Sequence, residues 1–197
     1  MMGIHRAVLS GNITEVRRQL IVLKAVKESI EVPTGNGKTS LELAVLHDVD
    51  PEIVQALLAA GAKPAFPIKL HESALVIASR TSSVVLPELI KHITPPSLLD
   101  IMDSEGFAPL HYCAQLGNLQ GVKALVTAGA LVNLKDAKSG RTALFHALES
   151  RNIDMAWHLV ENGASPNIVN FAGQSPAALV DEYRHNSLAE KFNQAVR

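Results

Sequence analysis

The sequence has little cysteine and few aromatic residues. Its 197 residues include one cysteine, Cys113, so no disulfide can form within the chain. Aromatic residues make up 4% of the chain, whereas hydrophobic residues as a whole make up 47%. The interior must therefore be built from Ala, Leu, Val and Ile, which suit short helices packed closely together.

An excess of one charge and long apolar runs are also missing. The formal net charge is −1, so there is no global basic field to hold a phosphate backbone, and we expect no direct contact with nucleic acid. No run approaches the roughly 18 apolar residues of a membrane span, and the first residues lack the long apolar core of a signal peptide. We therefore expect a cytoplasmic and/or nuclear protein that does not bind membranes.

The sequence does contain an internal repeat. Four-residue openers begin at residues 2, 39, 73, 108, 142 and 175, with spacings of 37, 34, 35, 34 and 33. The opener at 108 reads Ala108-Pro109-Leu110-His111, and the stronger copies are followed about 20 residues later by Gly-Ala, as at Gly129-Ala130. Such a period indicates a repeat architecture rather than one compact core.

The residue pattern of each repeat predicts two short helices. A Thr or Ser at the opener caps the first helix, a break such as Gly117-Asn118 ends it, and apolar residues at i, i+3 and i+4 mark the second. The Gly of Gly-Ala then provides a left-handed residue after the second helix. Because one helix pair cannot bury its own apolar face, we expect the units to stack and share a core.

This pattern resembles the ankyrin repeat over nearly the whole chain. The resemblance implies an all-α ankyrin-repeat solenoid of about six helix-turn-helix units with hairpin-like loops. We expect a single domain whose units span approximately 1–33, 34–67, 68–102, 103–136, 137–169 and 170–197. The third unit matches least well, because it lacks the Gly-Ala, carries Pro87 inside its second helix, and has Pro95-Pro96 in the loop that follows.

The last two units, in residues 136–180, resemble the fifth and sixth repeats of the IκB family. The matching features are the opener Ser139 to Leu144, a break that ends in Asn152, and the segment Phe171 to Pro176. The resemblance implies a monomeric regulator that binds a Rel/NF-κB dimer and controls its nuclear localisation or its DNA binding. It leaves open an inhibitor, a nuclear cofactor, a virus-type mimic or the ankyrin half of a Rel precursor. No Asp-Ser-Gly-type phosphodegron precedes the first unit. Residues 181–197 are not acidic, whereas the family's inhibitors that strip Rel dimers from DNA use an acidic tail, so the resemblance does not imply stripping.

In an ankyrin stack, the recessed face consists of the hairpin tips and the exposed side of the first helices. The same offsets from each opener give the candidate partner-binding residues here. They are Asn36, Lys38, Leu46, His47, Ser104, Glu105, Phe107, Gln115, Leu116, Lys135, Lys138, Arg141, Glu149, Ser150, Phe171, Gln174, Glu182 and Tyr183. Phe107, Leu116, Phe171 and Tyr183 are candidate anchors, with local loop packing as the alternative.

No motif indicates an enzyme. The segment GNGKTS at 35–40 is similar to a phosphate-binding loop, but Val32 stands where that motif needs its first glycine. The eight histidines do not have the spacing of a metal site, and Cys113 is expected to be a small buried residue rather than a nucleophile. We therefore expect no cofactor and no metal. The alternative to an IκB-like regulator is a general ankyrin adaptor that recognises a peptide or domain of another protein.

Overall fold

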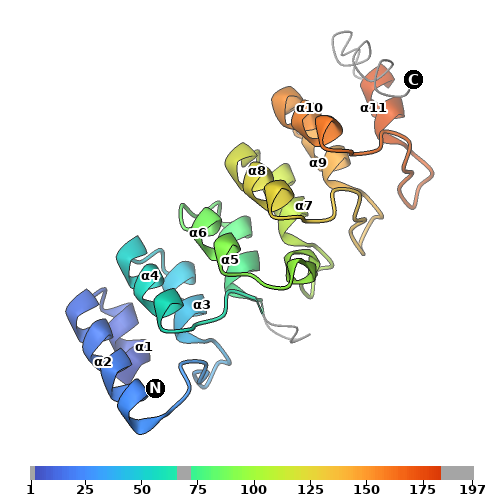
Figure 1. Cartoon of the computed structure of the whole chain (residues 1–197). Coiled ribbons are helices and arrows are strands. Elements are labelled where there is room, and N and C mark those ends of the chain that lie inside the picture. Colours follow the sequence, from blue (N-terminus) through green and yellow to red (C-terminus); the bar gives the residue numbers. More distant parts are fainter. Residues whose placement is uncertain (1–2, 66–71, 183–197) are drawn as a thin grey trace. The chain divides into compact units, whose positions relative to one another are not determined.

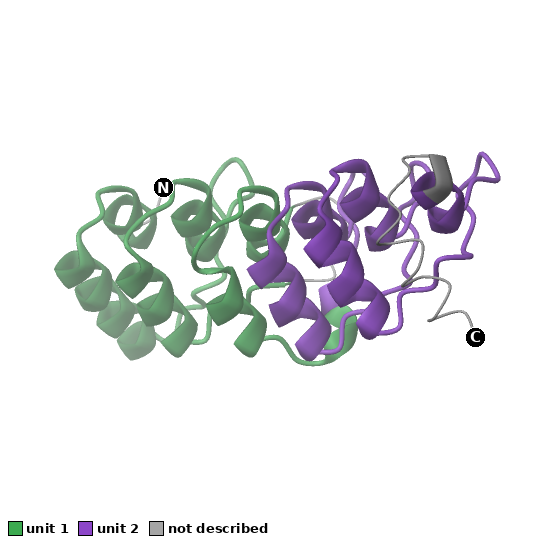
Figure 2. Cartoon of the chain, turned by 90° about the horizontal axis from the view of Figure 1, so that it is seen from above, with its two compact units in different colours: residues 1–98 green, residues 99–197 purple. Residues whose placement is uncertain are grey.

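The structure is a computed structural model that describes residues 3–65 and 72–182, except for the side chains of residues 181 and 182. The start of the first opener, Met2, and the candidate anchor Tyr183 lie outside the described residues. The chain divides into two compact units, residues 1–98 and residues 99–197 (Figure 2).

Unit 1 consists of three helix pairs (Figure 1). The first helices contact each other in order, α1 with α3 and α3 with α5, and the second helix α2 contacts α4. The helices are α1 (Gly3–Leu9), α2 (Ile13–Val26), α3 (Ser40–Leu46), α4 (Pro51–Ala59), α5 (Ala74–Arg80) and α6 (Leu86–Lys91).

Unit 2 repeats the same arrangement. Its first helices contact in the order α7, α9, α11, and the second helix α8 contacts α10. A short 3-10 turn (Pro96–Asp100) is followed by α7 (Pro109–Gln115), α8 (Leu119–Thr127), α9 (Ala143–Glu149), α10 (Ile153–Glu161) and α11 (Pro176–Glu182).

The predicted all-α repeat fold is confirmed. The described residues contain helices and loops but no strand, and the hairpin-like loops are held by isolated hydrogen bonds. Among these helices, none has the length and hydropathy needed to cross a bilayer. The division into six units within a single domain stays a prediction.

The helix starts follow the predicted capping chemistry. Thr39 Oγ1 accepts from the backbone N–H of Glu42 at 3.2 Å, and the Glu42 carboxylate accepts from the N–H of Thr39 at 2.9 Å, which completes a capping box. Asn118 caps α8 in the same way, through the N–H of Gly121. Thr142 is an exception, because its hydroxyl makes no cap to α9.

The helix ends also match the sequence. Gly61, Gly129 and Gly163 have φ of 95°, 96° and 89°, the left-handed conformation predicted for the Gly of each Gly-Ala. Pro87 lies inside α6, as predicted. It falls in the first turn, because α6 begins at Leu86, so its missing N–H leaves no helical hydrogen bond unmade.

The core is made mainly of small aliphatic side chains, as the composition predicts. Leu125 on α8 and Leu144 on α9 are fully buried, and so is Leu57 on α4. The bulkiest fully buried side chain is Phe145, which occupies the fourth opener position where α7 has His111. The shared core is therefore formed between consecutive pairs rather than within one pair.

The core position of Leu125 predicts a large effect on stability. We expect Leu125→Ala to lower the free energy of unfolding by about 2–5 kcal/mol, because it removes buried methyl groups and leaves a cavity. Leu131→Ala is the matched control, since Leu131 is exposed and its truncation should change stability by no more than about 0.5 kcal/mol. Urea unfolding followed by circular dichroism measures both, and equal effects would contradict the assignment of Leu125 to the core.

Candidate functional site

Three hairpin-like loops lie side by side in unit 2. The first residue of each loop donates a backbone hydrogen bond across its base, from Asp103 N to Phe107 O, from Asp136 N to Arg141 O and from Asn170 N to Gln174 O, and its carbonyl accepts a second one from the glycine of the tip. Neighbouring loops are joined as well. Ala137 N donates to Gly106 O and Phe171 N donates to Ser139 O, both at 2.9 Å, so the loops form a continuous row.

The first residue of each loop holds its tip in place. The Asp103 side chain accepts from the N–H groups of Glu105 and Phe107, and the Asn170 side chain accepts from those of Ala172 and Gln174. Thr34 does the same for Lys38 in unit 1. Sequence reasoning missed these residues. The signal was a Thr, Asp or Asn that recurs five or six residues before the openers.

Asp136 is the most fully hydrogen-bonded of these residues. Its buried carboxylate accepts from the N–H groups of Lys138, Ser139 and Arg141, from the Ser139 hydroxyl, and from His146 Nε2 at 3.2 Å. Burial acts to raise the pKa of Asp136, but the hydrogen bonds from Ser139 and His146 outweigh burial and hold the pKa below its ordinary value. The loop is therefore built around an ionised buried carboxylate.

Phe107 belongs to an aromatic cluster beneath the row of loops. Its ring centroid lies 5.4 Å from Tyr112, 6.3 Å from His111 and 5.9 Å from His146. The side chain is half-buried, and Lys138 Nζ lies 5.9 Å from the ring centroid on the outer side. These contacts give Phe107 a packing role within the cluster, in addition to any contact that its exposed part makes with a partner.

Both histidines of the cluster are held neutral. His111 Nδ1 accepts from the N–H of Ala108 and His111 Nε2 donates to Leu134 O, so a second proton on this ring would cost the Ala108 hydrogen bond. Burial lowers the pKa of His111. Burial also lowers the pKa of His146, and the neighbouring His111, 5.8 Å away between centroids, lowers it further.

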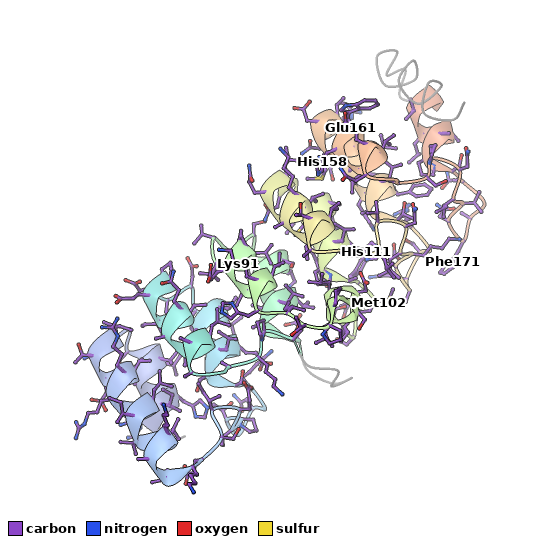
Figure 3. All side chains as sticks on the ribbon, viewed as in Figure 1. Lys91, Met102, His111, His158, Glu161 and Phe171 are labelled. Carbon is purple, nitrogen blue, oxygen red and sulfur yellow. The ribbon has the colours of Figure 1, made fainter. Side chains whose placement is uncertain are left out.

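Phe171 is the most exposed aromatic candidate among the described residues. It is 68% exposed, and Figure 3 labels it among the loops of unit 2. The inner face of its ring covers Gly140, because a Cβ atom built on Gly140 would lie 2.6 Å from the ring. Gly140 also has φ of 72°. Two constraints thus require glycine within the Ser-Gly-Arg-Thr segment.

The ends of the first helices continue the surface of unit 2. Arg141 reaches Glu149 at the end of α9 at 3.1 Å, and Ser150 Oγ donates to the carbonyl of Gln115 at 3.0 Å. Leu116 is exposed next to Gln115. The other candidates that lie exposed in unit 2 are Ser104, Glu105, Lys135, Lys138 and Gln174; the side chain of Glu182 is outside the described part.

The candidates of unit 1 form a smaller group. Asn36 and Lys38 lie in the loop before α3, and Leu46 and His47 lie exposed at its end. Lys38 Nζ lies 3.9 Å from Glu72, which also pairs with Arg80. Sequence reasoning did not identify Glu72 or Arg80, because only the stacked neighbour brings them to this loop.

The features that look catalytic have structural roles in this fold. In GNGKTS, Lys38 pairs with Glu72 and the Thr39 hydroxyl caps α3. Both groups therefore have structural partners and are not positioned as in a phosphate-binding loop. Cys113 is fully buried, as predicted. Within residues 3–65 and 72–182, no cluster of His, Cys, Asp or Glu has the geometry of a metal site.

Comparisons with known proteins agree with this geometry. A family model of three ankyrin repeats matches residues 41–136, and a single ankyrin-repeat model matches residues 139–171. The mouse B-cell lymphoma 3 protein homolog is 32% identical over 174 residues, which cover 87% of this chain and 39% of that protein. The NF-kappa-B inhibitor cactus of Drosophila yakuba is 28% identical over 82% of this chain and 33% of that protein.

A solved structure extends the comparison to the fold. The ankyrin repeat domain of Bcl-3, described as a member of the IkappaB protein family, aligns with a TM-score of 0.85 and 26% identity over 99% of this chain and 86% of that chain. The chain spans less than two fifths of the length of both curated relatives, 39% of the mouse protein and 33% of the Drosophila protein.

The two neutral histidines predict that stability falls in mild acid. Because their folded-state pKa values lie below the ordinary value of about 6.5, the unfolded chain takes up protons that the folded chain does not as the pH falls below that value. We expect the free energy of unfolding to decrease between pH 7 and pH 5.5. Urea unfolding at several pH values measures this slope.

The control is the double variant His111→Gln/His146→Gln, which should show a flatter slope over the same pH range. Glu31 and Asp100, whose pKa values burial raises, act in the opposite direction but are present in both proteins. Equal slopes in the two proteins would contradict the role assigned to the histidine pair.

Proposed function

Because this chain belongs to the ankyrin-repeat family and is similar to IκB-family proteins over most of its length, we propose that it is a protein-binding regulator of Rel/NF-κB dimers. It binds such a dimer as a monomer and controls the dimer's nuclear localisation or DNA binding, in the cytoplasm, the nucleus or both. The observation that carries the proposal is the similarity of 87% of the chain to the B-cell lymphoma 3 homolog.

The proposed contact surface is the row of loops and the ends of the first helices. In unit 2 it combines an exposed aromatic ring, Phe171, an exposed aliphatic side chain, Leu116, and the cations Lys135 and Lys138. Exposed aromatic and large apolar side chains are where interfaces concentrate their binding energy. In unit 1, Asn36, Lys38 and His47 offer polar contacts and Leu46 offers an exposed apolar one.

Direct binding to Rel dimers is the first test. The purified chain is mixed with a panel of Rel-family dimers, with and without their DNA site, and complexes are detected by size-exclusion chromatography. We expect a complex with at least one dimer. Failure to bind any dimer would remove the proposal and favour a general ankyrin adaptor. Retention of DNA in the complex indicates a nuclear cofactor, and loss of DNA indicates an inhibitor.

Phe171 gives a sharper test of the surface. We expect Phe171→Ala to weaken binding to that dimer by about 1 kcal/mol or more, because it removes an exposed aromatic anchor. Val169→Ala, another exposed apolar truncation in the same segment, should have a smaller effect. Titration calorimetry measures both, and urea unfolding is run in parallel. Lost affinity together with a lower unfolding midpoint would instead mark Phe171 as structural.

A further inference from the structure

The second helix of the first pair is longer than its counterparts. Helix α2 has 14 residues, whereas α4, α8 and α10 each have nine. The extra residues, 22–26, lie in the repeat with the longest opener spacing, 37 residues against 33 to 35 for the others. The repeat fold does not need this extra turn, so its side chains are free to serve another purpose.

The C-terminal part of α2 exposes apolar side chains. Ile21 is 70% exposed, Val26 is 56% exposed and Val22 is 47% exposed, although all three lie on a regular helix. Leu23, between them in the sequence, is buried and belongs to the core of unit 1. Three exposed branched side chains so near one another at the end of a helix are more typical of an interaction surface than of a solvated helix face.

A groove lies beside this turn, wholly within unit 1. Its volume is about 610 Å³, and its walls come from the second half of α2, the loop that follows, and the last residues of α4. The lining is mainly apolar and includes three charged side chains, Lys24, Lys27 and Glu28. The lining residues are Leu20, Ile21, Leu23, Lys24, Lys27, Glu28, Ile30, Ala59 and Ala60.

The charged residues of the groove favour binding of an acidic ligand. Lys24 and Lys27 face one carboxylate of the lining, Glu28, and no ion pair to either lysine is formed within the described part of the chain. By contrast, Arg17 and Arg18 on the same helix are paired with Glu52 and Glu15. The two lysines therefore remain available to an incoming carboxylate.

Lys27 also occupies an unusual backbone conformation. Its φ is 58°, in the left-handed region, at the end of α2 where the clearest other second helices have Gly61, Gly129 and Gly163. A left-handed lysine costs about 1 kcal/mol more than a glycine would at such a position. A carboxylate that pairs with the Lys27 ammonium group would offset this cost.

From these observations we propose that the groove between α2 and the end of α4 binds an amphipathic, acidic segment of a partner protein. Apolar side chains of that segment enter the groove and cover Ile21 and Val26, and its carboxylates pair with Lys24 and Lys27. The apolar contact supplies most of the affinity, because exposed ion pairs contribute little, and the lysines supply the charge preference. The concave shape fits a peptide segment better than a flat lipid surface. This surface is separate from the row of loops proposed to bind Rel dimers.

The test uses defined peptides with the full-length chain. Three 16-residue helical peptides share one leucine stripe and carry Glu, Gln or Lys on the polar face. Binding is measured by fluorescence anisotropy and located by NMR chemical-shift changes. We expect the Glu peptide to bind at least tenfold more tightly than the Lys peptide, with shifts confined to residues 20–30 and the end of α4. Equal binding of all three, no binding, or shifts elsewhere overturns the proposal.

Charge reversal provides the matched variant. In Lys24→Glu/Lys27→Glu the preference should invert, so that the Lys peptide binds more tightly than the Glu peptide. Lys123→Glu, an exposed lysine on α8, is the control and should leave the preference unchanged. All of these positions are exposed, so the urea unfolding midpoint should be unaffected. Loss of binding without inversion, or the same effect from Lys123→Glu, contradicts the role of the two lysines.

The apolar half of the proposal has its own variant pair. Ile21→Asp should weaken the Glu peptide at least fivefold, whereas Val84→Asp, which changes an equally exposed apolar residue before α6, should not. Two further measurements test the other possible occupants. Binding to vesicles with anionic headgroups tests a lipid surface, and sedimentation velocity of the chain alone tests a second copy of the chain. Binding to vesicles that is stronger than to the Glu peptide, or dimerisation that Ile21→Asp abolishes, overturns the assignment to a partner segment.

Discussion

Most helices of this protein are six to nine residues long, which is too short for a helix to be stable by itself in water. Their stability must come from burial against neighbouring pairs, and the contacts α1 to α3 to α5 and α7 to α9 to α11 supply it within each unit. The rest of the structure depends on this shared burial. It explains why the core consists mainly of small aliphatic residues, and why the pairs that end at Gly61, Gly129 and Gly163 use a glycine to turn the chain toward the next pair.

The loops are stabilised by side-chain hydrogen bonds, because they have no strand pairing to hold them. A buried or half-buried Thr, Asp or Asn at the start of each loop accepts the N–H groups of the tip, and Asp136 is the extreme case with five donors. A buried carboxylate is tolerable only when it is satisfied in this way. The result is a rigid row of tips that holds Lys138 and Phe171 in fixed positions, which reduces the entropy that a partner must overcome.

The two proposed surfaces arise from the repeat in different ways. The row of loops carries residues that every repeat presents at the same offsets, so its specificity lies in which side chains occupy those offsets. The groove beside α2 comes from an insertion in one repeat only, and it exists because the extra turn has no neighbour to cover it. A repeat scaffold can therefore acquire a new contact surface by lengthening one helix without disturbing the shared core.

The sequence by itself determined the repeat, the two helices of each unit and the glycines that end them, because period, caps and left-handed turns are local properties. It also predicted that Cys113 is buried. It did not reveal that Asp136 meets His146, that Phe171 covers Gly140, or that Phe107 packs on three other rings. It also could not show that the residues inserted before position 39 lengthen α2 and open a groove against α4. Apart from the contacts of Phe107 with His111 and Tyr112, these features join residues 10 to 40 positions apart, and only the tertiary packing decides which of them touch.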